Sequence, residues 1–216
     1  MASHAARVTE LEDLAPSVVQ VTVAVDGTFS FRPGQWVNFR FPDGVARAYT
    51  IASPPERPDA IQLCVRVGSG RGGEALKKLE IGAEVKLDGP FGDFVLPENE
   101  DRDVVFLAGD TGIAPVRSIV LHLLATGDPR RTYVLYEPDR RNILYAGDFD
   151  PLARSGKIVH ESGAIETLIH RNRRAVSSSI LMAAGFDPFL ERVHKALAEV
   201  DVPSEGLIQE TFGPKP

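Results

Sequence analysis

The sequence predicts a two-domain protein: a small antiparallel β-barrel over residues 1–97, followed by an α/β domain with a parallel sheet over residues 98–216. In the first half, short runs rich in valine and aromatic residues alternate with glycine and proline, which is typical of antiparallel strands. In the second half, continuous apolar runs alternate with helical patterns, which favours parallel strands joined by crossover helices. The polar stretch Pro97–Asp101 separates the two patterns and is the expected linker.

The barrel is expected from four strand-like runs, one helix and a closing turn. The runs are Ser17–Val25, Phe29–Phe41, Ala48–Ala52 and Ile61–Val67. The helix is expected over Gly73–Leu79, and Asp88–Phe94, which contains glycine and proline, is expected to form turns that end the unit.

The α/β domain is expected to begin with Val104–Ala108, a continuous apolar run typical of a strand buried on both faces. The other expected strands are Thr132–Tyr136, Lys157–Val159, Ser179–Ala183 and Leu207–Thr211. Helical patterns cover Pro115–Ala125 and Pro188–Val200.

Composition narrows the classes of function. The chain carries 24 Lys and Arg against 30 Asp and Glu, a net charge of −6, which argues against a nucleic-acid-binding protein because such proteins usually carry a basic face. The single cysteine, Cys64, excludes an all-cysteine metal cluster within these residues, and the five histidines lack metal-ligand spacing, so no metal site is expected. We expect a cytoplasmic protein without a membrane span, because no apolar run reaches about 18 residues and no apolar signal segment begins the sequence.

Two segments of the barrel carry groups suited to a flat cofactor with phosphates. In Arg47-Ala48-Tyr49-Thr50 a guanidinium could hold a phosphate, a tyrosine could stack on a ring and a hydroxyl could bind a ring nitrogen. In the sequence SGRGGE, Gly70, Gly72 and Gly73 precede a helix and could bring backbone N–H groups close to an anion. The ordinary alternatives are an exposed arginine beside a core tyrosine, and a flexible loop.

Three segments of the second domain have similar potential. Gly109–Pro115 connects a buried strand to a helix, which is the context of a nucleotide pyrophosphate turn, although it is not the usual Rossmann fingerprint. Ala184 and Gly185 end a strand with small residues, against which a ligand ring could lie, and Phe212 could cover a flat cofactor. The alternatives are an ordinary strand-to-helix turn and a core aromatic residue.

Taken in order, these segments resemble the ferredoxin–NADP reductase superfamily of flavoproteins that react with pyridine nucleotides. The resemblance extends from about Arg7 to Phe212 and is strongest at FRPGQWV, RAYTIAS, GPFGDF and DTGIAPVRS. It implies a flavoprotein oxidoreductase that transfers hydride from NADH or NADPH to bound FAD, rather than FMN. Electrons would then pass to a separate redox protein or a small-molecule electron acceptor.

The resemblance also implies residue roles. Thr50 would donate to flavin N5, Tyr49 would stack on the flavin, and Phe212 would cover its opposite face, so these three form the predicted catalytic group. Further contacts with FAD are implied for Arg47, Ala48, Val65, Val67, Gly70, Gly72 and Gly73. Contacts with the pyridine nucleotide are implied for Gly109, Thr111, Gly112, Pro115, Ala184 and Gly185.

The sequence departs from the family pattern at the nucleotide turn, where Asp110 replaces a glycine, and at Ala184, which replaces a cysteine. Two alternatives therefore stay open: a flavin reductase that uses free flavin as substrate, and a non-enzymatic flavin-binding regulatory or interaction module with a degraded nucleotide site. Glu137 and Asp139 favour NADH, because a carboxylate after the second strand can accept a hydrogen bond from the ribose 2′-hydroxyl. The neighbouring Arg140 and Arg141 could instead hold a 2′-phosphate.

Overall fold

A computed structural model describes residues 3–57, 59–140 and 142–214 of the chain. These residues form two compact units, each of which is described by itself below. The first unit runs to Val95 and also includes Arg117–Thr126, whereas the rest of the chain from Leu96 onward belongs to the second unit. The change at Val95 lies close to the expected limit at residue 97, but the assignment of Arg117–Thr126 to the first unit was not predicted. Part of one helix is therefore included with the barrel.

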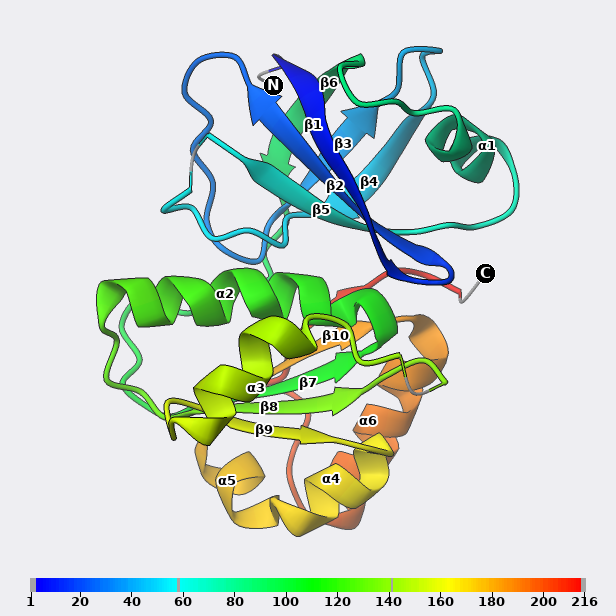
Figure 1. Cartoon of the computed structure of the whole chain (residues 1–216). Helices are drawn as coiled ribbons and strands as arrows, with labels where there is room; N and C mark the ends of the chain where they lie inside the picture. Colours follow the sequence, from blue (N-terminus) through cyan, green and yellow to red (C-terminus); the bar gives the residue numbers. More distant parts are fainter. Residues whose placement is uncertain (1–2, 58, 141, 215–216) are drawn as a thin grey trace. The chain divides into compact units, whose positions relative to one another are not determined.

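The first unit is a closed antiparallel sheet. Its strands are β1 (Ser3–Ala15), β2 (Val18–Val25), β3 (Trp36–Arg40), β4 (Ala46–Thr50), β5 (Ile61–Arg66) and β6 (Glu84–Phe91). They are hydrogen-bonded in the order β4-β3-β6-β1-β2-β5 (Figure 1). A bridge between Ile51 and Leu63 joins the chain just after β4 to β5, so the two edge strands meet and the sheet closes into a barrel. A short helix, α1 (Arg71–Lys77), lies between β5 and β6.

The structure corrects three expectations for the barrel. The long strand β1 was not predicted at all. The expected strand Phe29–Phe41 is wrong over its first part, because a turn with a hydrogen bond from Gln35 N to Arg32 O precedes the strand that begins at Trp36. The expected turns over Asp88–Phe94 are wrong as far as Phe91, since this stretch belongs to β6 and pairs with β1 and β3.

Gly34, in the turn that precedes β3, packs closely against the chain that follows β6. Gly34 has φ +100°, in the region that favours glycine, and an added Cβ would lie 1.9 Å from the carbonyl oxygen of Phe94. The barrel interior is filled by apolar side chains with almost no exposed surface, among them Val37, Phe39 and Leu87. The first unit therefore has a core of its own.

The second unit contains a parallel five-stranded sheet. Its strands are β7 (Val104–Gly109), β8 (Thr132–Glu137), β9 (Val159–Ser162), β10 (Ile180–Gly185) and β11 (Ile208–Thr211). Their order is β11-β10-β7-β8-β9. The chain runs from β7 toward β9 on one side and from β10 toward β11 on the other, so the direction of winding changes between the neighbouring strands β7 and β10, which form the switch point of the sheet. Ligands of open α/β sheets bind at such a switch point, outside the carboxyl ends of the strands.

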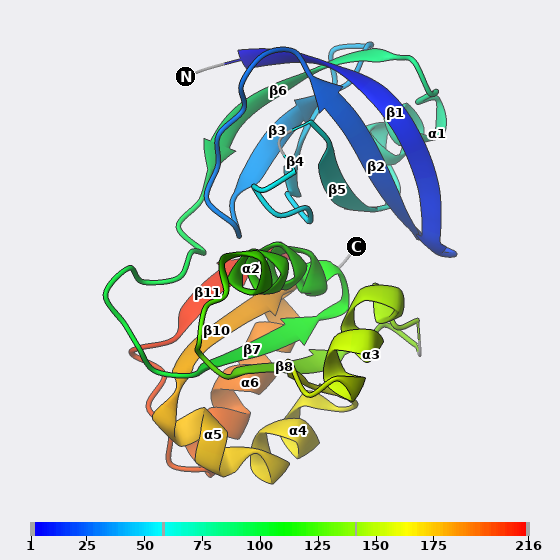
Figure 2. The same cartoon turned by 60° about the vertical axis from the view of Figure 1, so that its left-hand side comes forward.

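Helices accompany this sheet. They are the 3-10 turn η1 (Asp110–Gly112), α2 (Ile113–Thr126), α3 (Ala146–Arg154), α4 (Ile165–Arg171), α5 (Arg173–Ser178) and α6 (Asp187–Glu199). Helices α4, α5 and α6 cover one face of the sheet (Figure 2). Helices α3, α4 and α5 were not predicted, and the expected strand Lys157–Val159 is displaced, because β9 begins only at Val159.

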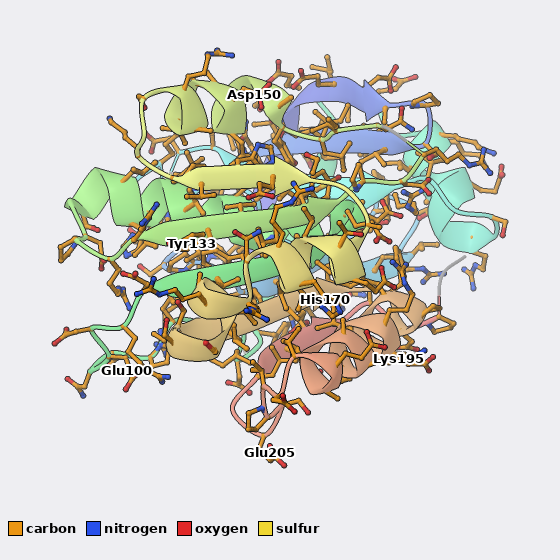
Figure 3. All side chains as sticks on the ribbon, turned by 90° about the horizontal axis from the view of Figure 1, so that it is seen from below. Glu100, Tyr133, Asp150, His170, Lys195 and Glu205 are labelled. Carbon is orange, nitrogen blue, oxygen red and sulfur yellow. The ribbon has the colours of Figure 1, made fainter. Side chains whose placement is uncertain are left out.

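The covered face is visible with its side chains in Figure 3, where His170 of α4 and Lys195 of α6 lie on neighbouring helices. His170 and Glu199 form a surface pair across these helices, with Nε2 and Oε2 3.2 Å apart. Beneath them, residues such as Leu168, Val193 and Leu197 are almost fully buried against the sheet. None of the helices among the residues that the structure describes is long and apolar enough to cross a membrane.

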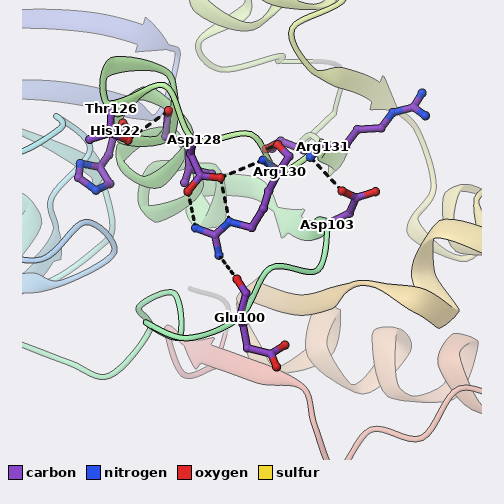
Figure 4. Close-up of polar contacts among 9 residues, drawn as sticks. Glu100, Asp103, His122, Thr126, Asp128, Arg130 and Arg131 are labelled. Atoms are coloured by element: carbon purple, nitrogen blue, oxygen red, sulfur yellow. Dashed lines mark hydrogen bonds and ion pairs between the residues drawn. The ribbon is translucent and has the colours of Figure 1, made fainter.

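The amino-terminal end of the sheet is fixed by polar contacts (Figure 4). Arg130 holds Asp128 through two guanidinium nitrogens, and it also donates to the carbonyl oxygen of Glu100 at 3.1 Å. The carboxylate of Asp103 accepts from the backbone N–H of Arg131 at 3.0 Å. These contacts connect the segments that enter β7 and β8, at the opposite end of the strands from the switch point.

Candidate functional site

The first group of candidate residues lies on β4 and α1 of the barrel. The side chain of Arg47 lies directly against the backbone of Gly72. A Cβ added to Gly72 would lie only 2.8 Å from the Arg47 Nε atom. The arginine side chain is exposed, and its Nη1 donates to the carbonyl oxygen of Ala46 at 2.7 Å. An exposed guanidinium beside the backbone N–H groups that begin a helix can hold an anion. These residues therefore fit the phosphates of the expected FAD.

The other glycines of this loop have different roles. Gly70 is exposed and has φ +86°, a conformation that favours glycine. Gly73 is buried, and an added Cβ would lie 1.9 Å from the carbonyl oxygen of Gly68. The loop closes so tightly on itself that Gly73 is required by packing. Its contact with a pyrophosphate stays a prediction.

Tyr49 and Thr50 follow Arg47 on the same strand. The Tyr49 ring is half-buried, with ring centroids 6.1 Å from Phe39 and 6.4 Å from Phe41. Burial raises the pKa of Tyr49 to about 12, although the charge of Arg47 opposes the shift, so the phenol stays neutral near pH 7. A neutral, half-buried ring suits stacking on a flat cofactor.

The remaining barrel candidates differ in how accessible they are. Thr50 is 8% exposed, whereas Ala48 is exposed. Val67 is partly buried against the barrel core, but Val65 is fully buried within it. Only the backbone of Val65 could therefore contact a cofactor.

Sequence reasoning missed two residues that position this strand end. Arg117 donates from Nη1 to the carbonyl oxygen of Ala52 and to Oε1 of Gln62, both at 2.8 Å. Ser118 donates its hydroxyl to the carbonyl oxygen of Ser53 at 2.7 Å. Both residues lie in the segment that belongs to the first unit, and both are buried. They fix the turn that directly follows Thr50.

The second group of candidate residues lies at the carboxyl ends of β7 and β10. A Cβ added to Gly109 would lie 2.5 Å from the Phe189 ring, and one added to Gly185 would lie 2.7 Å from the same ring. A Cβ added to Gly112 would lie 2.0 Å from the carbonyl oxygen of Ala184. The sequence assigned these glycines to the nucleotide. The structure gives them a packing role between the two strand ends, and their contact with a ligand stays a prediction.

The turn between β7 and α2 is buried. Thr111 is 4% exposed, and Pro115 lies in the first turn of α2. Asp110, which stands where the family pattern has a glycine, adopts φ 56° and is 7% exposed. A residue with a Cβ in this left-handed conformation carries strain that a glycine would not.

Phe212 is held at the carboxyl end of β10. Its backbone N–H donates to the carbonyl oxygen of Gly185 at 3.0 Å, and its half-buried ring meets Phe186 edge-on with centroids 5.8 Å apart. The neighbouring Thr211 hydroxyl donates to the carboxylate of Asp187. The expected aromatic residue is therefore fixed beside the switch point of the sheet.

The sequence-based role of Glu137 is not supported by its contacts. We expected its carboxylate to accept from a ribose hydroxyl, but both oxygens already accept from Arg192, and Oε2 also accepts from the backbone N–H of Ile165 at 2.8 Å. Arg192 also binds Glu166 and lowers the pKa of that carboxyl to about 2. Arg192 could not be found from sequence, since it lies 55 residues from Glu137 along the chain.

The described residues contain no group of three or more histidine, cysteine, aspartate or glutamate side chains arranged to hold a metal ion. The candidate residues thus form two sets, each within its own unit: Arg47, Gly72 and the half-buried Tyr49 on the barrel, and the glycine-rich switch point of the parallel sheet.

Comparison with known proteins identifies relatives of both units. Residues 5–96 match the family model of the oxidoreductase FAD-binding domain. Over 142 residues the chain is 36% identical to the reductase component DmpP of phenol 2-monooxygenase from Pseudomonas sp. (strain CF600), covering 64% of this chain and 40% of that protein. Over 164 residues it is 35% identical to ferredoxin–NADP reductase B of Sorangium cellulosum (strain So ce56), covering 72% of this chain and 67% of the relative.

The fold has a similar counterpart among solved structures. This chain matches the crystal structure of the Amycolatopsis cytochrome P450 reductase GcoB with a TM-score of 0.87 and 22% sequence identity. The match covers 99% of this chain and 70% of the GcoB chain. The chain therefore shares the two-unit fold of that reductase. The matched part spans less than half the length of the phenol 2-monooxygenase component.

Proposed function

The chain belongs to the ferredoxin–NADP reductase family, and from this membership we propose that it is an oxidoreductase that takes electrons from NADH or NADPH onto FAD and passes them to a separate acceptor. The first unit, whose residues 5–96 match the oxidoreductase FAD-binding domain, is the proposed domain for FAD. The second unit, with its parallel sheet and switch point, is the proposed domain for the pyridine nucleotide.

One observation carries the proposal: the guanidinium of Arg47 lies over Gly72 at the start of α1, inside the domain that matches FAD-binding proteins. A positive side chain beside the backbone N–H groups that begin a helix favours a ligand with phosphates. FAD contains a diphosphate and a flat isoalloxazine ring joined by a ribityl chain, and Tyr49 stands two residues from Arg47 on the same strand. The residues present thus fit FAD.

When bound, FAD supplies the redox chemistry, because it accepts a hydride and releases electrons to an acceptor. In this proposal the protein contributes position. Tyr49 would offer its neutral ring for stacking, and the Thr50 hydroxyl would donate a hydrogen bond to the flavin. Arg117 and Ser118 act as positioning residues, since they fix the turn that follows Thr50.

On the second unit we propose that the turn Gly109–Pro115 receives the nucleotide, with Ala184 and Gly185 on the adjacent strand. Phe212 keeps its proposed role as the aromatic residue that covers the cofactor. Its backbone hydrogen bond to Gly185 and the contact of its ring with Phe186 support this role, because they hold Phe212 at the carboxyl end of β10.

The acceptor is proposed to be a separate redox protein. The DmpP relative is named as the reductase component of a phenol 2-monooxygenase, and the Sorangium relative as a ferredoxin–NADP reductase. Both names describe reductases, one of them a component of a larger enzyme system. We place the reaction in the cytoplasm, where NADH and NADPH are generated.

The experiment that tests this function is anaerobic reduction of the FAD-loaded protein by NADH and by NADPH, followed at the flavin absorbance. The proposal expects a protein that is purified yellow, with one flavin per chain, and that is bleached by at least one nucleotide. A colourless protein that is active with added free flavin would instead indicate a flavin reductase. A flavin-binding protein that neither nucleotide reduces would overturn the proposal and favour the regulatory module.

A further inference from the structure

A cluster of three charged side chains stands at the carboxyl end of β8. Arg192 of α6 donates to Glu137 from Nη1 at 2.7 Å and from Nη2 at 2.5 Å. It donates to Glu166 of α4 from Nε at 2.6 Å and from Nη2 at 3.0 Å. One positive charge is therefore shared by two carboxylates, and the cluster carries a formal charge of −1.

The cluster borders a small pocket. Arg192 and Glu137 line a cavity of about 130 Å³ together with Gly109 and Phe186, at the carboxyl ends of the parallel strands. Among the residues that the structure describes, the other charged residues of the lining, Asp110 and Asp139, are both acidic. Because ligands of such sheets bind outside the carboxyl ends of the strands, this pocket adjoins the proposed nucleotide turn.

The contacts of Arg192 bear on whether the pocket favours NADH or NADPH. A 2′-phosphate adds about two negative charges and needs a cation to hold it. Four of the five N–H groups of Arg192 already donate to Glu137 and Glu166, so a 2′-phosphate would meet two carboxylate charges that one guanidinium does not balance. A nucleotide with a free 2′-hydroxyl avoids this repulsion.

We propose that the cluster of Arg192, Glu137 and Glu166 is the specificity determinant that makes this chain prefer NADH to NADPH. The inference rests on the proposed function, and it replaces the expected hydrogen bond from the ribose to Glu137 with a charge-based selection. Of the two arginines that could hold a 2′-phosphate, Arg140 is not among the described lining residues, and Arg141 lies outside the part of the chain that the structure describes. The determinant acts on binding of the adenosine half of the nucleotide rather than on hydride transfer.

The test compares the wild type with Glu166→Gln. Glutamine keeps one oxygen to accept from Arg192 but removes one negative charge, whereas a change at Glu137 would also disturb the contact with Ile165. Wild type is expected to favour NADH in kcat/KM by at least about tenfold, and Glu166→Gln to reduce this ratio about tenfold. The change is expected in the KM for NADPH, with the rate of flavin reduction at saturating nucleotide unchanged.

Glu199→Gln is the matched control. Glu199 also lies on α6 and pairs with a side chain of α4, but it does not line the pocket. This variant is expected to keep the wild-type ratio. A wild-type preference for NADPH, or a ratio that Glu166→Gln leaves unchanged, would overturn the inference.

A binding measurement separates this inference from the proposed function. Calorimetry with 5′-ADP and with adenosine 2′,5′-bisphosphate reports selection against the 2′-phosphate without any turnover. Weaker binding of the bisphosphate in wild type, with a smaller difference in Glu166→Gln, supports the inference even if neither nucleotide reduces the flavin. Equal binding of the two compounds by wild type would contradict it, even if NADH proves to be an efficient reductant.

Discussion

Arg117 donates a hydrogen bond from its guanidinium to the carbonyl oxygen of Ala52, 65 residues earlier in the chain, at 2.8 Å. The arginine is only 7% exposed, and Ala52 has no exposed surface. The bond therefore connects the first unit's helical segment to the turn after the strand that carries Arg47, Tyr49 and Thr50. The proposed flavin contacts depend on a residue far outside their own motif.

Replacement of Arg117 by methionine is expected to lower the free energy of unfolding by roughly 1–3 kcal/mol, because the buried carbonyl oxygen of Ala52 loses a charged donor. Urea unfolding followed by circular dichroism measures this loss. Arg174→Met, at an exposed position of α5, is the control and should change stability by less than about 0.5 kcal/mol. Equal stability of the two variants would show that the Arg117 contact is dispensable.

Arg47→Ala is expected to weaken FAD binding about 10- to 150-fold, which corresponds to the loss of one charge-assisted contact worth about 1.5–3 kcal/mol. Folding should be little affected, since Arg47 is exposed. Fluorescence titration of the apoprotein with FAD measures the dissociation constant. Arg40→Ala removes another barrel arginine, one paired with Asp88, and should leave the constant unchanged. An unaltered constant in Arg47→Ala would refute the assignment of the phosphate site.

Asp110→Gly is expected to stabilise the fold by up to about 1 kcal/mol, because φ 56° suits glycine better than a residue with a Cβ. It should also lower the KM for the nucleotide by up to about tenfold, as a carboxylate near phosphates is removed. Asp110→Asn separates the two effects, since asparagine tolerates this conformation and removes only the charge. Its KM should fall as in the glycine variant, while its thermal stability stays near wild type.

The pH dependence of stability is expected to reveal the ion pair of Glu166. Its pKa lies at about 2 in the folded protein, below the usual 4.5, chiefly because Arg192 donates to the carboxylate. A lowered pKa means that the stabilisation is complete above about pH 4.5 and disappears as pH falls toward 2. Because the Glu166 side chain is 39% exposed, we expect roughly 1 kcal/mol at pH 7.

Unfolding of wild type and Glu166→Gln at several pH values measures this contribution. The two stabilities should differ at pH 7 and converge near pH 2. Glu205→Gln serves as the reference, because Glu205, labelled in Figure 3, is exposed in the loop before β11. The stability of this variant should follow that of wild type at every pH. A difference between wild type and Glu166→Gln that persists unchanged down to pH 2 would contradict the assigned pKa.

The sequence predicted the parallel sheet well because its central strands are continuous apolar runs, and Val104–Gly109 is buried at every position. It did not reveal β1, because only Ala6 and Val8 of this strand are buried. The remaining positions are polar or at least partly exposed. Backbone hydrogen bonds to β2 and β6, rather than burial of its side chains, stabilise β1. Such pairing leaves little trace in the local pattern of apolar residues.

Some of the candidate site residues could be predicted from the sequence, and others could not. Arg47, Tyr49 and Thr50 could be proposed from sequence because they are neighbours on one strand. Arg117 and Arg192 could not, since their partners lie 65 and 55 residues away and the contacts exist only in the folded chain. For the same reason Glu137 was assigned to a ligand, although its carboxylate is held by another part of the protein.

The pairing of β1 with β6 also sets the order of events during synthesis. Ser3 pairs with Asp88 and Arg7 with Glu84, so one edge of the first strand has no partner until the last strand of the barrel has been made. At about 5–20 residues per second, the nascent chain exposes this edge for roughly ten seconds. Arg7 places a charge on this edge, and charged edges resist pairing with other chains. Glu10, Glu12 and Asp13 add charges farther along the strand, where it pairs with β2. We therefore expect the polar sequence that conceals β1 from prediction also to limit aggregation of the unfinished barrel.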